Sequence, residues 1–205
     1  LNVEGQTIHS FFLIPPNITP DKVLEHKLSG KRKKLISSLD MIIIDEASML
    51  RADLLDCIDV SLRHHWQEES LPFGGVQMVF IGDLYQLPPV VAGKEEREIF
   101  RSHYSSPYFF SAKSIQELDI TFLELEKVYR QKDNDFISLL NMVRDNSIDF
   151  KNLERLNAQH DPDHKTDGNE DFVITLTTTN AQADKINMDQ LEMLSTQHET
   201  FFGEV

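Results

Sequence analysis

Two adjacent acids, Asp45 and Glu46, directly follow the apolar run Met41–Ile44. Four apolar residues in a row predict a strand buried on both faces, which is typical of a parallel sheet in an α/β protein. Ligands of such sheets bind outside the carboxyl ends of the strands, so we expect both carboxylates at a ligand-binding edge. An aspartate there can hold magnesium (Mg2+) through its waters, and the neighbouring glutamate can polarise a water for attack on a γ-phosphate. The same pair also fits a strand-end turn, or the first turn of a helix, where the dipole favours carboxylates.

A second apolar run, Met78–Ile81, is followed by another acid. The residues after it are Gly82-Asp83-Leu84-Tyr85-Gln86-Leu87-Pro88-Pro89. Two short buried strands that each end in an acid indicate neighbouring parallel strands whose ends meet at one edge. Gly82 permits another backbone segment to approach closely, and the two prolines impose an extended, stiff exit from the loop.

These stretches resemble the motifs of a known family of motor proteins. Asp45–Met49 and Gly82–Pro89 are similar to motifs II and III of the petite-integration-frequency (PIF) DNA helicases, which are superfamily 1B motors related to RecD. Gly5–Phe12 looks like their motif Ia, and Val128–Gln131 looks like their motif IV. The motifs occur in the family's order over roughly the first two thirds of the chain, and motif III with its double proline is the most specific of them.

The resemblance implies an α/β fold with a RecA-like parallel sheet flanked by helices. Residues 1–121 would form the first motor domain without its P-loop strand, and residues 122–205 would begin the second. The sequence contains no Gly-x-x-x-x-Gly-Lys-Ser/Thr motif. In the family that phosphate-binding loop lies upstream of Gly5, and the later motifs would lie beyond Val205. We therefore expect a fragment of a helicase core that does not hydrolyse ATP by itself.

The resemblance also implies roles for four side chains. Asp45 would hold the Mg2+ of Mg-ATP, and Glu46 would activate the attacking water. Gln86 would sense the γ-phosphate and couple its state to the DNA path. Arg130 would reach the γ-phosphate from the domain boundary, because a guanidinium matches phosphate geometry and keeps its charge. The alternative for Arg130 is an interdomain salt bridge.

Two clusters are expected to bind single-stranded DNA. In motif Ia we assign Thr7, His9 and Ser10 to the phosphodiester backbone, since hydroxyl and amide donors are typical of such contacts. The alternative is a Ser/Thr-capped helix with the two phenylalanines of Phe11-Phe12 in the core.

The second DNA cluster, Thr178 and Asn180, lies between an expected strand over 172–176 and an expected helix over 181–194. It resembles the beginning of the family's second motor domain, where such a Thr/Asn cluster meets DNA phosphates. A helix N-cap made by Thr179 or Asn180 is an equally good interpretation.

Periodicity and turn signals predict the remaining elements. We expect helices over 49–66, 111–117, 133–144 and 153–157, strands over 76–81 and 122–125, and a mobile loop over 161–171. The dense basic run Lys31–Lys34 is most often a solvated face, with a phosphate-contacting role as the alternative. His64 and His65 lack Cys or acidic residues at ligand spacing, so we expect them to complement a helix end rather than to bind zinc.

Composition limits the class of protein. The net charge of −14 argues against a general nucleic-acid coat, so DNA binding would need a local basic surface. No apolar segment reaches membrane-spanning length and no signal peptide is present, so we expect an intracellular protein of the bacterial cytoplasm, nucleus or mitochondrion. The single cysteine excludes an intramolecular disulfide. No obligate protein partner can be inferred.

The function expected from the resemblance is ATP-driven 5′–3′ translocation on single-stranded DNA with unwinding of duplexes. Two alternatives stay open. One is a non-catalytic RecA-like binding module, and the other is a RecD-type exonuclease subunit. The intact pair Glu46 and Gln86 argues against the binding module, which has no need of a water-activating acid.

Overall fold

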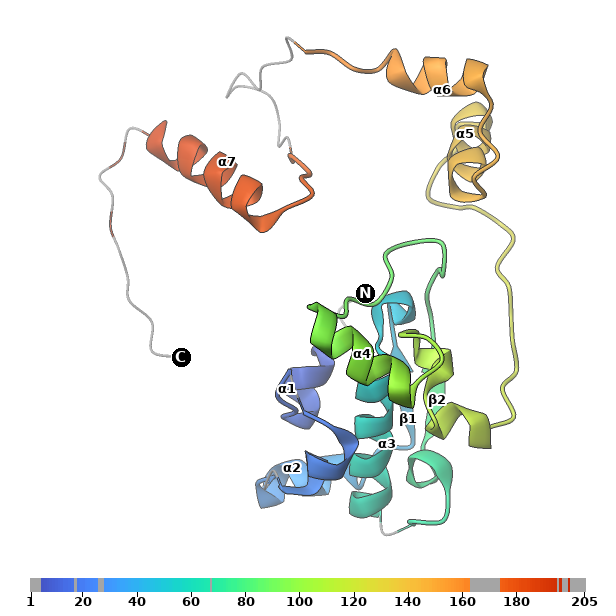
Figure 1. Ribbon diagram of the computed structural model, residues 1–205, viewed down its shortest axis with the longest axis vertical. Coiled ribbons are helices and arrows are strands. Elements are labelled where there is room, and N and C mark those ends of the chain that lie inside the picture. Colours follow the sequence, from blue (N-terminus) through green and yellow to red (C-terminus); the bar gives the residue numbers. More distant parts are fainter. Residues whose placement is uncertain are drawn as a thin grey trace. The chain divides into compact units, whose positions relative to one another are not determined.

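The computed structural model describes residues 5–16, 18–25, 28–66, 68–162, 174–194, 196 and 199, without the side chains of residues 95 and 99. The chain divides into two compact units, Leu1–Asn152 and Leu153–Val205 (Figure 1). This division does not test the predicted boundary between motor domains at residues 121–122, which stays a prediction.

A small parallel sheet lies in the first unit. Strand β1 is Met41–Ile44 and strand β2 is Gln77–Phe80, and their register pairs Met41 with Gln77 and Ile44 with Phe80. Both predicted strands and their parallel pairing are confirmed. Because β1 and β2 are parallel neighbours, the residues that follow them emerge at the same edge of the sheet.

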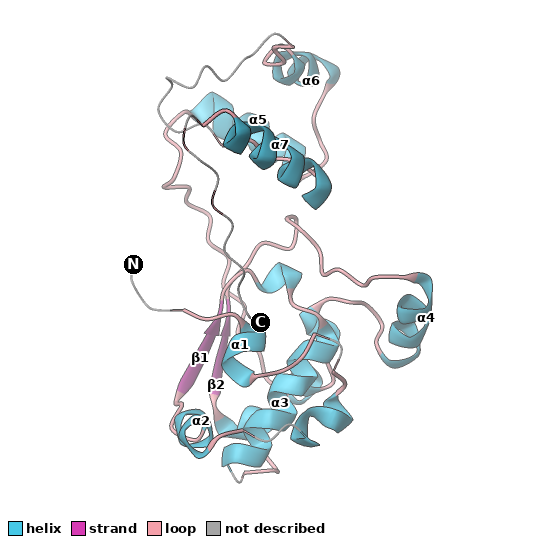
Figure 2. Ribbon diagram, turned by 90° about the vertical axis from the view of Figure 1, so that its left-hand side faces the viewer, coloured by secondary structure: helices cyan, strands magenta, loops and turns pink. Residues whose placement is uncertain are grey.

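Only one face of the sheet is covered within the described residues. Ile44 is buried and Ile42 packs partly against the core, whereas Met41 and Ile43 are 45% and 60% exposed. Figure 2 shows α1 and α3 on one side of the two strands. The expectation that β1 is buried on both faces is therefore wrong for the described chain, because no described element packs on Met41 and Ile43.

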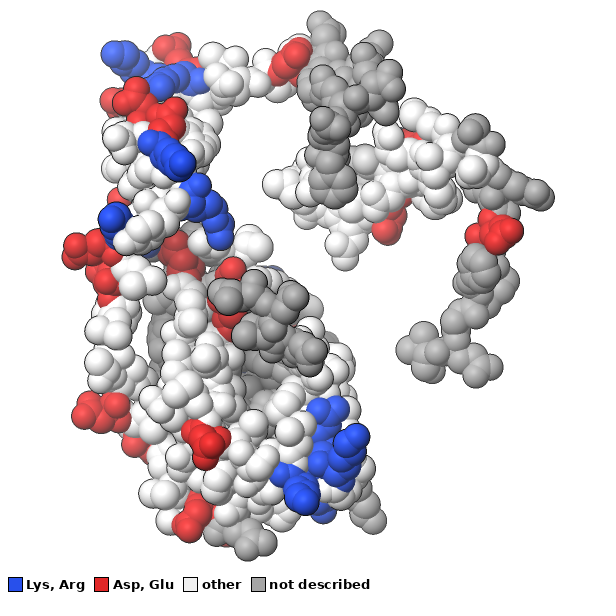
Figure 3. Space-filling model, turned by 180° about the vertical axis from the view of Figure 1, so that it is seen from behind, with Lys and Arg blue, Asp and Glu red and all other residues white. Residues whose placement is uncertain are grey.

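Two short helices precede the sheet. Helix α1 is Ile8–Phe12 and helix α2 is Gly30–Ile36, with the 3₁₀ helix Pro20–Glu25 between them. The α2 N-cap is Ser29, whose Oγ accepts a hydrogen bond from the backbone N–H of Arg32 at 3.3 Å. The basic run Lys31–Lys34 lies on α2. Figure 3, which views the molecule from behind, shows a group of Lys and Arg side chains in the lower part of the surface.

Helix α3, Ala52–Trp66, is the centre of the hydrophobic core. Its Leu55, Ile58 and Leu62 are fully buried, at the helical spacing that the sequence predicted. A 3₁₀ helix, Ala47–Met49, lies between β1 and α3, so α3 begins later than the expected residue 49.

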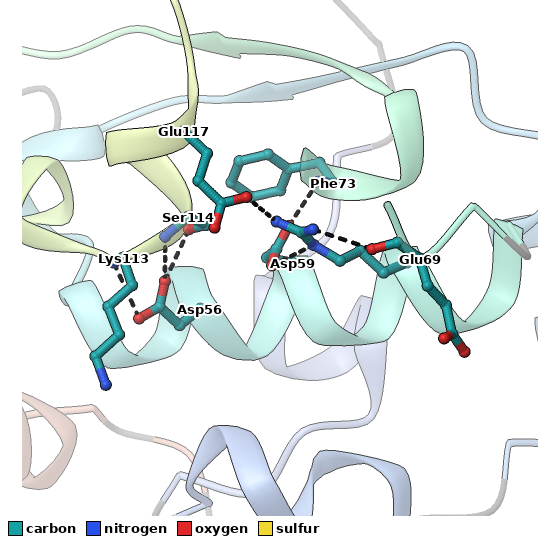
Figure 4. A network of polar contacts seen from close by, with 8 residues as sticks. Asp56, Asp59, Glu69, Phe73, Lys113, Ser114 and Glu117 are labelled. Atoms are coloured by element: carbon teal, nitrogen blue, oxygen red, sulfur yellow. Dashed lines mark hydrogen bonds and ion pairs between the residues drawn. The ribbon is translucent and has the colours of Figure 1, made fainter. Parts of the chain in front are cut away.

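Two buried carboxylates on α3 hold the surrounding turns in place (Figure 4). Asp59 accepts hydrogen bonds from the backbone N–H of Phe73 at 2.6 Å and from the Arg63 guanidinium at 2.8 Å. Burial raises the pKa of Asp59, and the hydrogen bonds to its carboxylate act in the opposite direction. Phe73 lies in the turn Pro72–Gly75, where Phe73, Gly74 and Gly75 have φ of 54°, 62° and 80°.

The region predicted as a helix over 111–117 forms two 3₁₀ helices instead, Phe109–Ser111 and Ser114–Glu117. The second α3 carboxylate, Asp56, explains the tight turn. It accepts hydrogen bonds from the backbone N–H of Lys113 and Ser114, from the Ser114 hydroxyl and from the Tyr104 hydroxyl, at 2.8–3.2 Å. These contacts satisfy backbone donors of the turn that would otherwise have no acceptor.

The remaining helices are α4 (Lys94–His103), α5 (Asn134–Arg144), α6 (Phe150–Asn157) and α7 (Asn180–Glu192). Helix α5 is capped by Asp133, whose carboxylate accepts from the backbone N–H groups of Asp135 and Phe136. The predicted helices over 133–144 and 153–157 are confirmed within a few residues. No helix among the described residues has the length and apolar character to cross a membrane.

Two predicted strands do not form in the described residues. Phe122, Leu123 and Leu125 are 81%, 82% and 91% exposed and pair with no described strand. Residues 174–176 are also irregular, while 172 and 173 lie outside the described residues. Most of the predicted loop over 161–171 likewise lies outside them. A strand needs a neighbour for its backbone hydrogen bonds, and among the described residues neither 122–125 nor 174–176 has one.

Candidate active site at the carboxyl edge of the sheet

The segments after β1 and β2 lie in direct contact. The Ile81 N–H donates to the Ile44 carbonyl at 2.9 Å, and the Ala47 N–H donates to the Ile81 carbonyl at 2.9 Å. A Cβ at Gly82 would lie 2.9 Å from the Ala47 nitrogen, closer than side chains are found to approach backbone. The predicted close approach at Gly82 is confirmed, and it brings the Asp45-Glu46 turn next to the start of the loop after β2.

Glu46 has an unusual backbone at this edge. Its φ of 52° and ψ of 42° lie in the left-handed region, which costs a non-glycine residue about 1–3 kcal/mol. Asp45 and Glu46 are both exposed, and the Glu46 N–H donates to Asp45 Oδ1 at 2.9 Å. Glu46 precedes a 3₁₀ helix, but its side chain makes no capping hydrogen bond. The carboxylate of Glu46 is therefore not used to cap the turn that it begins.

Gln86 is held at the same edge by Asp83. The Gln86 N–H donates to the Asp83 carbonyl at 3.0 Å, and its side-chain Nε2 donates to Asp83 Oδ2 at 3.3 Å. The Tyr85 N–H donates to Asp83 Oδ1 at 3.1 Å. Asp83 thus closes the turn that carries Gln86, a role that our residue assignments from the sequence omitted. The available signal was its position directly after β2, equivalent to that of Asp45 after β1.

Arg144 contacts the same turn from the last residue of α5, within the first unit. Its guanidinium forms an ion pair with Asp83 Oδ1 at 3.3 Å and lies 4.9 Å from the centre of the Tyr85 ring. Both contacts are partly exposed, so each contributes modestly to stability. The contact joins residues 61 positions apart, and no local sequence signal could have indicated it.

Arg51 supports the far end of the loop. Its guanidinium binds both oxygens of Asp53 at 2.7 and 3.0 Å, Glu96 at 2.8 Å and the Val90 carbonyl at 3.4 Å. The hydrogen bond to Asp53 is the largest contribution that raises the pKa of Arg51, so the cation is permanent. One cation therefore ties the start of α3 to the end of the loop and to α4.

The donor set at the edge fits a magnesium–nucleotide ligand better than a metal held by protein alone. The described residues contain no group of three His, Cys, Asp or Glu side chains that could hold a metal ion. Asp45 offers one exposed carboxylate. Mg2+ in nucleotide enzymes takes one or two carboxylates and completes its shell with waters and substrate phosphates, so a single aspartate is sufficient.

Arg130 is not brought to this edge by any contact in the described residues. It is exposed, lies in the segment 119–133 and forms no ion pair with a described residue. The alternative of an interdomain salt bridge thus gains no support from the described chain, and its proposed role at the phosphate stays a prediction.

The motif Ia residues lie around the start of α1. Thr7 is the N-cap, and its Oγ1 accepts from the Ser10 N–H at 3.3 Å, which leaves the Thr7 hydroxyl proton available to donate. His9 Nδ1 donates to the Ile14 carbonyl at 2.8 Å, and the Ser10 side chain is exposed. Phe12 is buried and Phe11 is half-buried against the core, so the capped-helix alternative is met in part, and it leaves the Thr7 hydroxyl proton available to donate.

The second DNA cluster lies at the start of α7. Thr179 is the N-cap, and its Oγ1 accepts from the Gln182 N–H at 3.4 Å. Thr178 and Asn180 flank the cap and are exposed. The N-cap interpretation is confirmed for Thr179, while the proposed phosphate contacts of its two neighbours stay predictions.

Comparison with known proteins identifies the family. The model of the PIF1-like helicase family matches residues 1–154. The chain belongs to this family. The PIF1-like match covers the whole stretch that carries the four motifs, so the resemblance drawn from them is confirmed.

The relatives are ATP-dependent DNA helicases from bacteria and eukaryotes. The chain is 28% identical to "ATP-dependent DNA helicase Pif1" of Campylobacter jejuni over 100% of this chain and 45% of the relative. It is 31% identical to "ATP-dependent DNA helicase PIF1" of Emericella nidulans over 98% of this chain and 26% of the relative. The chain thus spans less than half the length of the curated relatives that it matches.

Solved structures of PIF1-like helicases have the same fold. A Bacteroides Pif1 in complex with ADP-AlF3 and single-stranded DNA matches 95% of this chain and 45% of its own, with 37% identity and a TM-score of 0.86. Pif1 from Candida albicans matches 96% of this chain and 42% of its own, with 26% identity and a TM-score of 0.76. The α/β arrangement with its small parallel sheet is therefore that of part of a Pif1 helicase.

Proposed function

We propose that this chain is part of the motor core of an ATP-dependent DNA helicase, which couples Mg-ATP hydrolysis to 5′–3′ movement on single-stranded DNA and to duplex unwinding. The observation that carries the proposal is the edge where the Asp45-Glu46 turn contacts Gly82. Residues 1–121 would belong to a first RecA-like domain and residues 122–205 to the start of a second. The Bacteroides Pif1 structure, which contains ADP-AlF3 and single-stranded DNA, supports a nucleotide and single-stranded DNA as the two ligands.

Each residue at the edge has a distinct task in this proposal. Bound Mg2+ supplies positive charge that neutralises the phosphates, and Asp45 would hold it through its carboxylate. Glu46 would accept a proton from the attacking water, and its unoccupied carboxylate supports this task. Gln86 would sense the γ-phosphate, and Arg130 would reach the γ-phosphate from the domain boundary and stabilise its charge. Because Asp83 closes the Gln86 turn, it would act as a positioning residue.

The proposal places the DNA backbone on Thr7, His9 and Ser10 in the first unit and on Thr178 and Asn180 in the second. Exposed side chains at Ser10, Thr178 and Asn180 and the free hydroxyl proton of Thr7 support these assignments.

Strand separation tests the proposal and its alternatives together. The complete polypeptide of the native gene would be given ATP, Mg2+ and duplexes with a single-stranded tail at either the 5′ or the 3′ end. We expect separation of the 5′-tailed duplex only. Shortened DNA products would support the exonuclease alternative, and DNA binding without ATP turnover would support the binding module.

A further inference from the structure

Helix α2 carries an unusual concentration of positive charge for a chain with a net charge of −14. The run Lys31–Lys34 occupies four consecutive positions of this seven-residue helix. Within the described part of the chain, none of the four side chains forms an ion pair with a carboxylate. No described carboxylate is therefore paired with the charge of α2.

Helix-end stabilisation accounts for only part of this charge. Lys33 and Lys34 lie in the last turn of α2, where a cation complements the helix dipole. Lys31 and Arg32 lie near the beginning of the helix, where positive charge opposes the dipole and carboxylates are favoured. The first turn of α2 contains no acidic residue. The helix dipole therefore accounts for Lys33 and Lys34 but not for Lys31 and Arg32.

The two lysines of the last turn border a hollow on the surface. Its volume is about 560 Å³, and it is lined by Lys33, Lys34, Ser37, His64, His65 and Glu69. The hollow thus lies between the end of α2 and the end of α3. Glu69 is the one carboxylate among its described lining residues, so that lining is predominantly cationic or capable of donating hydrogen bonds.

The basic helix is also continuous with the segment that carries motif Ia. The guanidinium of Arg32 lies 5.7 Å from the centre of the Phe11 ring on α1. This contact covers a face of Phe11, and it joins α2 to the helix that contains His9 and Ser10. A polyanion bound along α1 would therefore have the Arg32 cation next to the last turn of that helix.

We propose that α2 and the hollow at its end bind backbone phosphates of DNA next to those held by Thr7, His9 and Ser10. Lys33 and Lys34 are the principal contacts, and Arg32 links the two parts of the surface. The inference rests on the proposed DNA-binding function, and it explains how a strongly acidic chain holds a polyanion through a local basic surface.

The salt dependence of DNA binding tests this inference. The complete polypeptide would be titrated with fluorescent oligo-dT from low to high salt, as wild type and as the double variant Lys33→Ala with Lys34→Ala. Each phosphate contact on single-stranded DNA contributes about 0.7 to the slope of log K against log salt, so we expect a slope smaller by about 1.4. Between 50 and 200 mM salt, wild type should then lose roughly sevenfold more affinity than the variant.

A matched control separates a local contact from a loss of net charge. The pair Lys151→Ala with Lys185→Ala removes the same charge from exposed positions outside α2, and it should keep the wild-type slope. The α2 variant should match wild type on an oligonucleotide just long enough to cover the motif Ia residues. An unchanged slope in the α2 variant, or an equal change in the control, overturns the inference but leaves the proposed function standing. Absence of DNA binding by wild type overturns both the inference and the proposed function.

Discussion

Replacing Gly82 by alanine should destabilise the protein at the candidate active site. The added Cβ would lie 2.9 Å from the Ala47 nitrogen, 3.1 Å from the Ser48 nitrogen and 3.5 Å from the Ala47 Cα. All three neighbours are main-chain atoms, so no flexible side chain can move aside. Gly82 is not among the described glycines with positive φ, so the cost is steric and not conformational.

The magnitude follows from three contributions. Overpacking against rigid atoms costs about 1–3 kcal/mol, and weakening of the Ala47 to Ile81 hydrogen bond costs about 1 kcal/mol. The lower entropy of an unfolded chain with alanine returns about 0.5 kcal/mol. We therefore expect Gly82→Ala to lower the free energy of unfolding by about 1.5–3.5 kcal/mol.

Urea unfolding followed by the fluorescence of Trp66, the chain's single tryptophan, would measure this change. Gly30→Ala is the matched control, because its added Cβ would meet nothing within 4 Å apart from its chain neighbours and its own helix backbone. That variant should be neutral or slightly stabilising. Equal stabilities for the two variants would refute the inferred contact between the turn after β1 and the loop after β2.

Three further predictions concern the core and the phosphate site. In urea unfolding, Asp56→Ala should lower the free energy of unfolding by about 3–5 kcal/mol, because it leaves several buried donors unsatisfied. The exposed control Asp119→Ala should change it by less than about 0.5 kcal/mol. Burial raises the pKa of the Cys57 thiol from 9.0 to about 12, so the folded chain should not react with a thiol reagent at pH 8; rapid native-state labelling would contradict this. Because the unfolded thiol ionises first, the free energy of unfolding should also fall as pH rises from 9 toward 12, relative to Cys57→Ala. Arg130→Lys should lower kcat for ATP hydrolysis by the complete polypeptide far more than it lowers DNA binding, and wild-type turnover would remove Arg130 from the proposed site.

The sequence predicted most reliably those elements whose stability is local. The helix over 133–144 formed as expected, because a helix makes its own backbone hydrogen bonds and Asp133 provides its cap. The pairing of β1 with β2 was predictable because each is a short apolar run closely followed by an acidic residue.

Predictions from the sequence were poor for strands and buried faces that depend on a segment far away in the chain. The apolar run at 122–125 has strand composition, but in the described chain it has no partner strand. The two-sided burial expected for β1 failed because Met41 and Ile43 have no described element packed on them. The hydrophobic pattern of a strand does not indicate which other segment will pack on it.

The candidate site shows the same division. Asp45, Glu46 and Gln86 were identified from motifs, and the contact at Gly82 was expected from its residue type. The left-handed backbone of Glu46 was not predictable, because glutamate has no preference for that region and tertiary contacts impose it. The Asp83–Arg144 ion pair was missed because its two residues belong to elements far apart in the sequence.

The central claim is that Glu46 activates the water that attacks ATP. The direct measurement compares Glu46→Gln with wild type in the complete polypeptide, recording ATP hydrolysis stimulated by single-stranded DNA and the binding of ATP and DNA. Loss of a general base lowers turnover by about 10²–10⁴-fold while leaving ground-state binding intact. If Glu46 is the general base, the kcat of Glu46→Gln falls by this factor while ATP and DNA still bind. Turnover equal to wild type in Glu46→Gln would contradict it.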